Sequence, residues 1–106
     1  MKTNQANAQI IISKEVSNYL DKNAESTGVP LEVMFINEQK DHVVSIGTSI
    51  MMNRLGFKTF PGSFVQAVLD NNLSASFNKA DHINRKCLGF YITMMLNLSI
   101  AISPED

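Results

Sequence analysis

The sequence has a single cysteine and no excess of positive or negative charge. Cys87 has no second cysteine to pair with, and its apolar neighbours indicate a small buried side chain in a reducing compartment, so we expect a cytoplasmic protein. Nine Lys and Arg residues stand against 10 Asp and Glu residues, which leaves a formal net charge of −1. Binding to nucleic acid or to an anionic membrane usually shows as a basic excess, so this composition argues against both partners.

The chain also lacks an apolar run long enough to cross a membrane. The segment from Cys87 to Ile102 is shorter than the ~20 residues of a bilayer span, and Gly89 and Thr93 dilute it further. Residues 1–9 are polar, and the three isoleucines that follow them are too few for a secretory signal before charge resumes at Lys14. We therefore expect neither a membrane span nor a secretory signal.

Catalytic and metal-binding signatures are missing as well. Ser76 and Lys79 have the serine-x-x-lysine spacing of penicillin-recognising enzymes, but the other motifs of those enzymes are absent. His42 and His82 each follow an aspartate at an expected helix start, and neither has metal-ligand spacing to Cys87 or to the other histidine. We expect a protein that is not an enzyme, with no catalytic residue, metal or cofactor, and with both histidines exposed in first turns.

The sequence does contain a helix that must be enclosed by protein. Residues 87–102, CLGFYITMMLNLSIAI, are apolar around nearly the whole circumference of a helix, and such a helix is buried on most sides. Asp81 is a good N-cap residue, so we expect the helix to begin there and to run to Ile102. It forms either the centre of a small bundle or a surface for self-association, for which a symmetric dimer is the commonest outcome. The residues expected at that interface are Leu88, Tyr91, Ile92, Met94, Met95 and Leu98.

The length of the chain predicts one domain with polar ends. We expect residues 1–9 to form a loose, disordered N-terminal tail, residues 10–102 a single helical domain, and residues 103–106 a polar C-terminal end. A first helix is expected after Ser13, because Val16, Tyr19 and Leu20 share one helical face.

Residues 30–55 admit two interpretations. In the first, a short helix over residues 30–38 is followed by a helix that Asp41 caps and that runs to Leu55, with Gly56 as its stop. In the second, EVMFI pairs with HVVSI across NEQKD as a β-hairpin at about 32–46, which the β-branched residues favour. We prefer helices, because the later periodicity, the Gly56 stop and the helical remainder agree with one another. The predicted fold class is all-α, a bundle of four to six helices, and the alternative is α+β with the hairpin.

Residues 61–80 predict two further short helices. Ser63 and Gln66 fit a capping box, in which the two side chains satisfy free backbone N–H groups at the start of a helix. After a break near residues 70–72, Leu73 and Phe77 are expected to anchor another short helix to the core.

The stretch from Pro61 to Leu88, PGSFVQAVLDNNLSASFNKADHINRKCL, resembles a motif of small helical proteins encoded by bacteriophages and prophages. The shared pattern is a Gly-Ser-Phe start, an Ala-Val-Leu helix, an Asn-Asn-Leu break and a Lys-Ala-Asp-x-x-Asn opening of the last helix. The resemblance implies an origin in a phage or another mobile element, and it implies no reaction. Asn72 and Lys79 depart from the pattern, in which Asp and Arg are common, so it implies no charge-dependent role for them.

The polar residues of this stretch are the best candidates for a ligand or partner site. They are expected around two helix ends, where backbone N–H groups bind an anion or a carbonyl. The candidates are Asn71, Asn72, Lys79, Asp81, Asn84 and Arg85. A second interpretation is structural: Asp81 caps its helix, Asn84 completes the cap three residues later, Arg85 pairs with Asp81, and the other asparagines close turns.

Three classes of function remain open. The first is a non-enzymatic interaction protein of phage or mobile-element origin, an oligomer that binds a host protein or sequesters a small anionic signalling ligand, in an accessory role against host defence. The second is a small DNA-binding transcription regulator that uses the helices after Ser63 and Asp81, although their connection is too long and the last helix too apolar for a DNA groove. The third is a small enzyme, for which no acid, base and nucleophile can be named. We expect the first.

Overall fold

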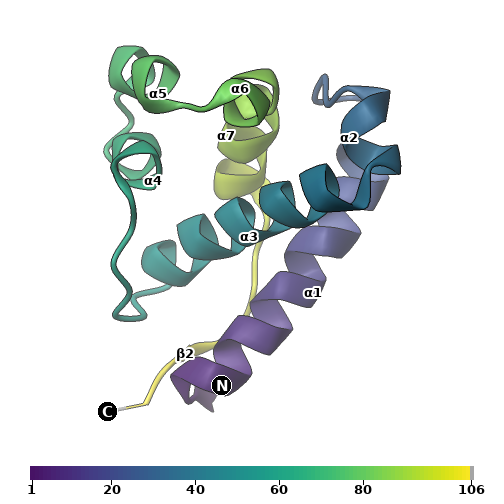
Figure 1. Cartoon of the computed structure of the whole chain (residues 1–106). Helices are drawn as coiled ribbons and strands as arrows, with labels where there is room; N and C mark the ends of the chain where they lie inside the picture. The colour runs from purple at the N-terminus through teal and green to yellow at the C-terminus, as the bar shows by residue number, and fades with distance from the viewer. Residues whose placement is uncertain (106) are drawn as a thin grey trace.

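Seven helices and one short strand pair make up residues 1–105, the part of the chain that the computed structural model describes (Figure 1). The helices are α1 (Gln5–Asn23), α2 (Leu31–Phe35), α3 (Asn37–Arg54), α4 (Ser63–Leu69), α5 (Leu73–Lys79), α6 (His82–Lys86) and α7 (Leu88–Asn97). The strands are β1 (Lys2–Thr3) and β2 (Ser103–Pro104). The all-α prediction is confirmed. Over residues 1–105 there are more helices than the expected four to six because the last predicted helix is divided into α6 and α7. Two of the seven, α2 and α6, have only 5 residues each.

The first helix begins earlier than expected, at Gln5. Asn4 Oδ1 accepts a 2.8 Å hydrogen bond from Asn7 N and so caps α1, and the buried residues Ala8, Ile12, Val16 and Leu20 follow at every fourth position. Before it, β1 pairs in parallel with β2, which joins the two ends of the chain. Within residues 1–9, expected as a loose tail, Lys2–Thr3 form β1 and the residues from Gln5 onward belong to α1.

Residues 30–55 form helices, and the hairpin alternative at 32–46 is wrong. Val33 is the buried residue of α2, and Ile36 separates α2 from α3. Since α3 begins at Asn37, Asp41 lies inside it and is not its N-cap. The predicted stop is confirmed, because Gly56 follows the helix with a φ of +92°, a left-handed conformation that favours glycine.

The predicted capping box at Ser63 is wrong. Ser63 is the first residue of α4, its N-cap is Gly62, and no side chain caps the helix. Gln66 instead donates through Nε2 to Asp70 Oδ1 at 2.9 Å.

The last predicted helix is divided at Cys87 and ends early. α7 stops at Asn97, and Leu98 is already extended with φ −76° and ψ 122°. The chain then runs as an irregular segment behind the helices to β2 beside the start of α1 (Figure 1). Ile102 is buried on the way, which accounts for the apolar residues that the sequence placed in one long helix.

The apolar α7 is enclosed by its own chain. It lies behind α3, which crosses it, and it contacts α1, α3 and α6 (Figure 1). Phe90, Tyr91 and Met94 have no exposed surface, and the Phe90 ring lies 6.0 Å from Tyr19 while the Tyr91 ring lies 5.7 Å from Phe64. The radius of gyration, 13.1 Å, equals that of a compact domain of about 100 residues. None of the helices in residues 1–105 has the length and apolarity to cross a lipid bilayer.

Candidate functional site

The six predicted site residues are not brought together in one cluster. Asn71 and Asn72 lie between α4 and α5, Lys79 ends α5, and all three are exposed. Asn71 has a positive φ of 58°, which asparagine tolerates in turns, and Asn72 Oδ1 accepts a 3.0 Å hydrogen bond from Ala75 N as the N-cap of α5. Both asparagines therefore have the turn and cap roles of the structural interpretation.

Asp81 links α6 to α3. Its Oδ1 accepts a 2.7 Å hydrogen bond from Asn84 N, which confirms the predicted cap of α6, and its Oδ2 lies 2.9 Å from His42 Nε2. The predicted pair between Asp81 and Arg85 is wrong. Arg85 donates through Nε to the Phe77 carbonyl oxygen at 3.1 Å, and its guanidinium lies 4.7 Å from the centroid of the Phe77 ring.

Asn84 is an interior residue and not a surface ligand. It is 3% exposed, and its Oδ1 accepts a 2.7 Å hydrogen bond from the Tyr91 hydroxyl. Burial raises the pKa of Tyr91, so its hydroxyl keeps the proton that it donates. Because the only described partner of the Tyr91 hydroxyl is the Asn84 amide oxygen, we remove Asn84 from the candidate site.

The residues predicted at an oligomer interface belong to the core of the single chain. Buried within the chain are Leu88, Tyr91, Met94 and Met95, and partly buried against them are Ile92 and Leu98. A helix that is apolar all round needs cover on most sides, and α1 and α3 supply much of it. The interface prediction is corrected accordingly: four of these side chains are interior, and Ile92 and Leu98 are only partly exposed.

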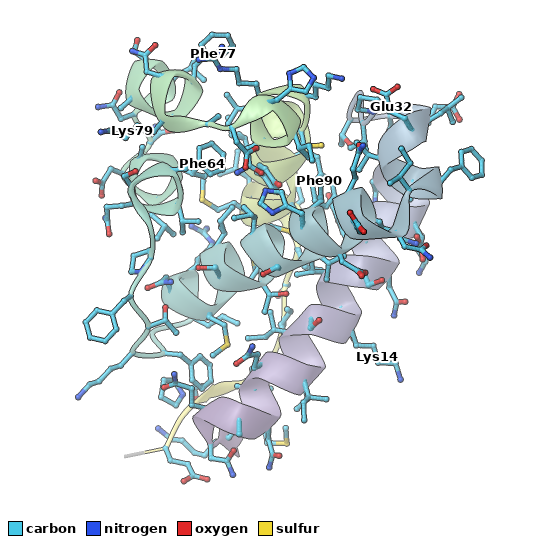
Figure 2. The ribbon with its side chains drawn as sticks, in the orientation of Figure 1. Lys14, Glu32, Phe64, Phe77, Lys79 and Phe90 are labelled. Carbon is cyan, nitrogen blue, oxygen red and sulfur yellow. The ribbon has the colours of Figure 1, made fainter. Side chains whose placement is uncertain are left out.

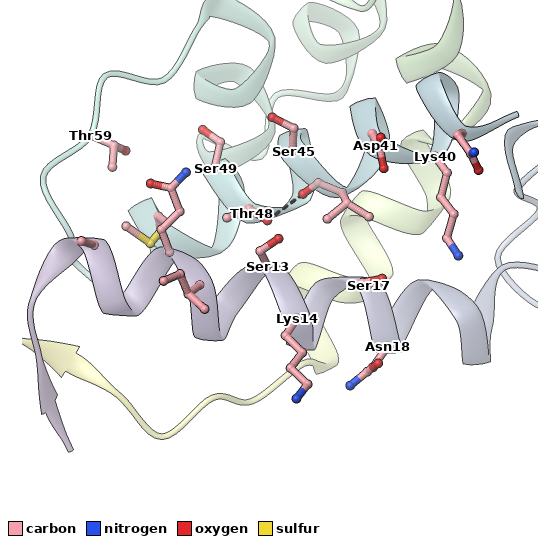
Figure 3. A pocket seen from close by; sticks show the side chains of 16 residues that line it. Ser13, Lys14, Ser17, Asn18, Lys40, Asp41, Ser45, Thr48, Ser49 and Thr59 are labelled. Atoms are coloured by element: carbon pink, nitrogen blue, oxygen red, sulfur yellow. Dashed lines mark hydrogen bonds between the residues drawn. The ribbon is translucent and has the colours of Figure 1, made fainter.

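An open groove of about 1200 Å³ lies between α1 and α3 (Figure 3). The α1 wall extends from Ala6 to Asn18 and the α3 wall from Asn37 to Met52, each through residues three or four positions apart, so that one face of each helix lines the groove. From Ala6 to Asn18, α1 makes twelve steps of 1.5 Å, so this wall of the groove is about 18 Å long. Thr59, in the loop after α3, closes one end.

Hydroxyl groups dominate the middle of this groove. Ser13 and Ser17 lie on α1, Ser45 and Ser49 lie on α3, and Ser13 points from α1 toward α3 (Figure 3). Within residues 1–105 none of these four hydroxyls has a hydrogen-bond partner in the chain, whereas the Thr48 hydroxyl donates to the Val44 carbonyl oxygen at 2.7 Å. The four serines therefore present unused donors and acceptors to whatever enters the groove.

The groove is close to neutral. Lys40 is paired with Asp21 at 2.7 Å, and the remaining charged residues along the walls are Lys14 and Asp41. The charges therefore favour neither an anion nor a cation, and recognition in the groove depends on hydrogen bonds.

Gly47 sets how closely the two walls approach. A Cβ at this position would lie 2.7 Å from Val16 Cγ1 of α1 and 3.4 Å from Met94 Sδ of α7. Only a residue without a side chain allows α3 to cross α1 and α7 at this distance. The width of the groove is thus determined by a packing contact in the core.

Outside the groove, the cysteine is buried and one of the two histidines is paired with a carboxylate. Burial raises the pKa of the Cys87 thiol to about 11, which makes it a poor nucleophile. His82 is exposed in the first turn of α6, as expected, but His42 is partly buried and paired with Asp81. Within residues 1–105 no three His, Cys, Asp or Glu side chains are placed to hold a metal ion.

Our sequence analysis missed the groove, although its signal was visible. Ser13 and Ser17, and again Ser45 and Ser49, are four residues apart and so share a helical face. What the sequence could not show is that the two faces would be opposite each other. That pairing depends on the α2 corner, which turns the chain back on itself.

No protein-family model matches this chain, and no curated protein and no solved structure shows significant similarity to it.

Proposed function

We propose that this protein acts by binding, and that the α1–α3 groove receives a polar, extended segment of a partner protein. The resemblance of residues 61–88 to small phage and prophage proteins supports an accessory role in which that partner belongs to the host. One observation carries the proposal: two facing walls present unpaired serine hydroxyls along a groove about 18 Å long.

An extended polypeptide fits this arrangement physically. Each of its residues brings one backbone donor and one acceptor, and these groups need partners when they leave water. The two serines on each wall are four residues apart, a rise of about 6 Å along the helix, so each wall offers two such partners in the middle of the groove. Their small size also allows the backbone of the segment to come close to both helices.

A small molecule fits less well. Sites for small molecules are enclosed, mostly apolar pockets of about 300–1,000 Å³ with a few polar groups. This groove is open along its length, and twelve of the sixteen residues that line it are polar. Its near neutrality also gives no preference for the small anionic ligand that the sequence left open.

The DNA-binding alternative finds less support in the structure. A recognition helix must be free to enter the major groove, and α6 has only 5 residues before the buried α7 follows. The pair of helices after Ser63 and Asp81 therefore supplies no free recognition helix.

A photo-crosslinker placed in the groove tests the proposal. We would introduce Ser45→Cys, label it selectively because Cys87 is buried, and irradiate the protein in host lysate to identify the adduct and its crosslinked segment. With the purified partner, we expect Ser45→Arg to weaken binding roughly tenfold, since the larger charged side chain obstructs the groove. The exposed Ser99→Arg, which adds the same charge outside the groove, should bind like the parent.

Equal binding by the parent and Ser45→Arg would refute the groove as the site. Native mass spectrometry of protein purified from its host adds a second criterion. A small molecule that remains bound in the spectrum would make that molecule, and not a segment of a partner protein, the occupant of the groove. The same spectrum measures the predicted dimer, whose interface would have to use a surface other than the buried face of α7.

A further inference from the structure

Helix α5 presents its apolar side to solvent. Leu73 and Phe77 are 63% and 50% exposed, whereas Ser76 is 2% exposed. The buried Ser76 hydroxyl is not left without a hydrogen bond, because it donates to the Asn72 carbonyl oxygen at 2.7 Å. This inverts the amphipathic pattern of a helix on the surface of a domain, and our prediction that Leu73 and Phe77 anchor α5 to the core is wrong.

Leu73 and Phe77 form one ridge beside the cation of Arg85; we call these three residues the α5–α6 surface. Leu73 and Phe77 are four positions apart and so lie side by side on α5. Figure 2 shows Phe77 at the outer edge of the molecule, pointing away from its body, and Lys79 on a different side of α5. Arg85 of α6 holds this edge in place, because it bonds to the Phe77 carbonyl and lies over the Phe77 ring.

The Arg85 cation of this surface has no carboxylate partner, in contrast to its neighbours. Lys86 is paired with Glu32 at 2.9 Å, and the Asp81 carboxylate is paired with His42. No ion pair to a carboxylate within residues 1–105 involves Arg85. An apolar ridge beside an unpaired positive charge is complementary to an apolar ridge with negative charges.

We infer that the α5–α6 surface binds an acidic amphipathic helix of a partner protein. Leu73 and Phe77 would pack against the apolar face of that helix, and a carboxylate at the edge of that face would pair with Arg85. Exposed aromatic and arginine side chains are the types that contribute most to binding at protein interfaces. Because Arg85 already orders Phe77, little rotamer freedom is lost when the partner binds.

An anionic membrane has related chemistry but is a poorer match. Stable attachment to lipid requires a long amphipathic helix or a cluster of several basic residues. α5 has 7 residues, and the cation that lies against its ridge is Arg85. The surface therefore has the size of a protein contact.

The chain contains a matched control for this inference. Leu31 and Phe35 of α2 are 75% and 79% exposed and have the same four-residue spacing. The charge beside them is Glu32, which Lys86 already neutralises. If exposed apolar area alone caused binding, α2 would bind as well as α5.

The test is an NMR titration of the ¹⁵N-labelled full chain with two synthetic helical peptides. Both peptides carry the same leucines, and one has glutamates where the other has lysines. We expect the acidic peptide to shift the amide signals of residues 72–86, and the basic peptide to leave them unchanged. Phe77→Ser and Arg85→Glu should each weaken the acidic peptide roughly tenfold or more, while the double variant Leu31→Ser with Phe35→Ser should bind like the parent.

Three results would overturn the inference. They are the absence of any shift in residues 72–86 at millimolar acidic peptide, equal binding of both peptides, and equal loss in the α2 double variant. Sedimentation with anionic phosphatidylserine vesicles adds a fourth, since tight vesicle binding that Arg85→Glu abolishes would assign the surface to lipid. The affected side chains are exposed, so we expect all variants to keep the dispersed spectrum of the folded chain.

Discussion

Replacing Gly47 with alanine tests the packing on which the groove depends. The added Cβ would lie 2.7 Å from Val16 Cγ1, whereas carbon atoms in ordinary contact are about 3.5–4.0 Å apart. Overpacking of this kind costs about 1–3 kcal/mol, and the better helix propensity of alanine offsets about 0.5–1 kcal/mol of it. We expect a net loss of roughly 1–2 kcal/mol, which lowers the Tm of a domain of this size by roughly 5–15 °C.

A double-mutant cycle identifies the cause of that loss. Val16→Ala removes the methyl group that the new Cβ would meet, at a cost of its own of about 2 kcal/mol for a buried truncation. In the combined variant the alanine at position 47 has room, so the two effects should fall short of additivity by about 0.5–2 kcal/mol. The assays are urea unfolding followed by circular dichroism and differential scanning calorimetry.

Gly62→Ala is the matched control. A Cβ at Gly62 would meet nothing within 4 Å, so the change should cost no more than about 1 kcal/mol, the difference between glycine and alanine at an N-cap. Strict additivity in the cycle, or a Gly47→Ala variant as stable as the parent, would refute the conclusion that Gly47 sets the distance between α1 and α3.

Three further predictions concern the C-terminal half of the chain. Tyr91→Phe leaves the buried Asn84 oxygen without its donor and should cost about 1–3 kcal/mol in urea unfolding, and a loss below 0.5 kcal/mol would contradict the buried pair. Asp81→Ala removes the α6 cap and the contact with His42, and it should lower the free energy of unfolding by about 1 kcal/mol. Asp81→Asn should keep most of the cap, and thermal unfolding of the two variants measures the difference. Since the pKa of Cys87 is raised to about 11, the folded thiol should react with a disulfide reagent at pH 9 far more slowly than the unfolded thiol, and equal rates would count against burial. For the same reason, the folded state should lose stability as pH rises through the pKa of the unfolded thiol, ~8.5.

Local chemistry made part of the fold predictable. The Asp81 cap, the left-handed Gly56 and the enclosed α7 each follow from one residue or one periodic pattern, and the structure has all three. The start of α1 was predictable in principle as well. Asn4 is a strong N-cap residue, and Ala8 begins the stripe of buried residues, but the polar residues between them resemble a tail.

Other features depend on tertiary contacts that no local pattern contains. Ser63 and Gln66 have the spacing of a capping box, yet the helix starts at Ser63 itself, so its hydroxyl is not in the N-cap position. Leu73 and Phe77 have the spacing of core anchors, yet α5 is docked through its opposite side. Periodicity shows which residues share a face, but the direction of that face depends on the packing of the neighbouring helices.

The two proposed surfaces can be separated experimentally because they depend on different contacts. Gly47 determines the approach of α1 to α3, so a Gly47→Ala chain that remains folded should have an altered groove and weaker binding of a segment held there. The α5–α6 surface is ordered by the contacts of Arg85 with Phe77, which involve neither α1 nor α3. Gly47→Ala should therefore leave binding of the acidic peptide unchanged, and Arg85→Glu should leave crosslinking from position 45 unchanged. Loss of both activities in either variant would indicate one continuous binding surface or a general loss of structure, which the unfolding curves distinguish.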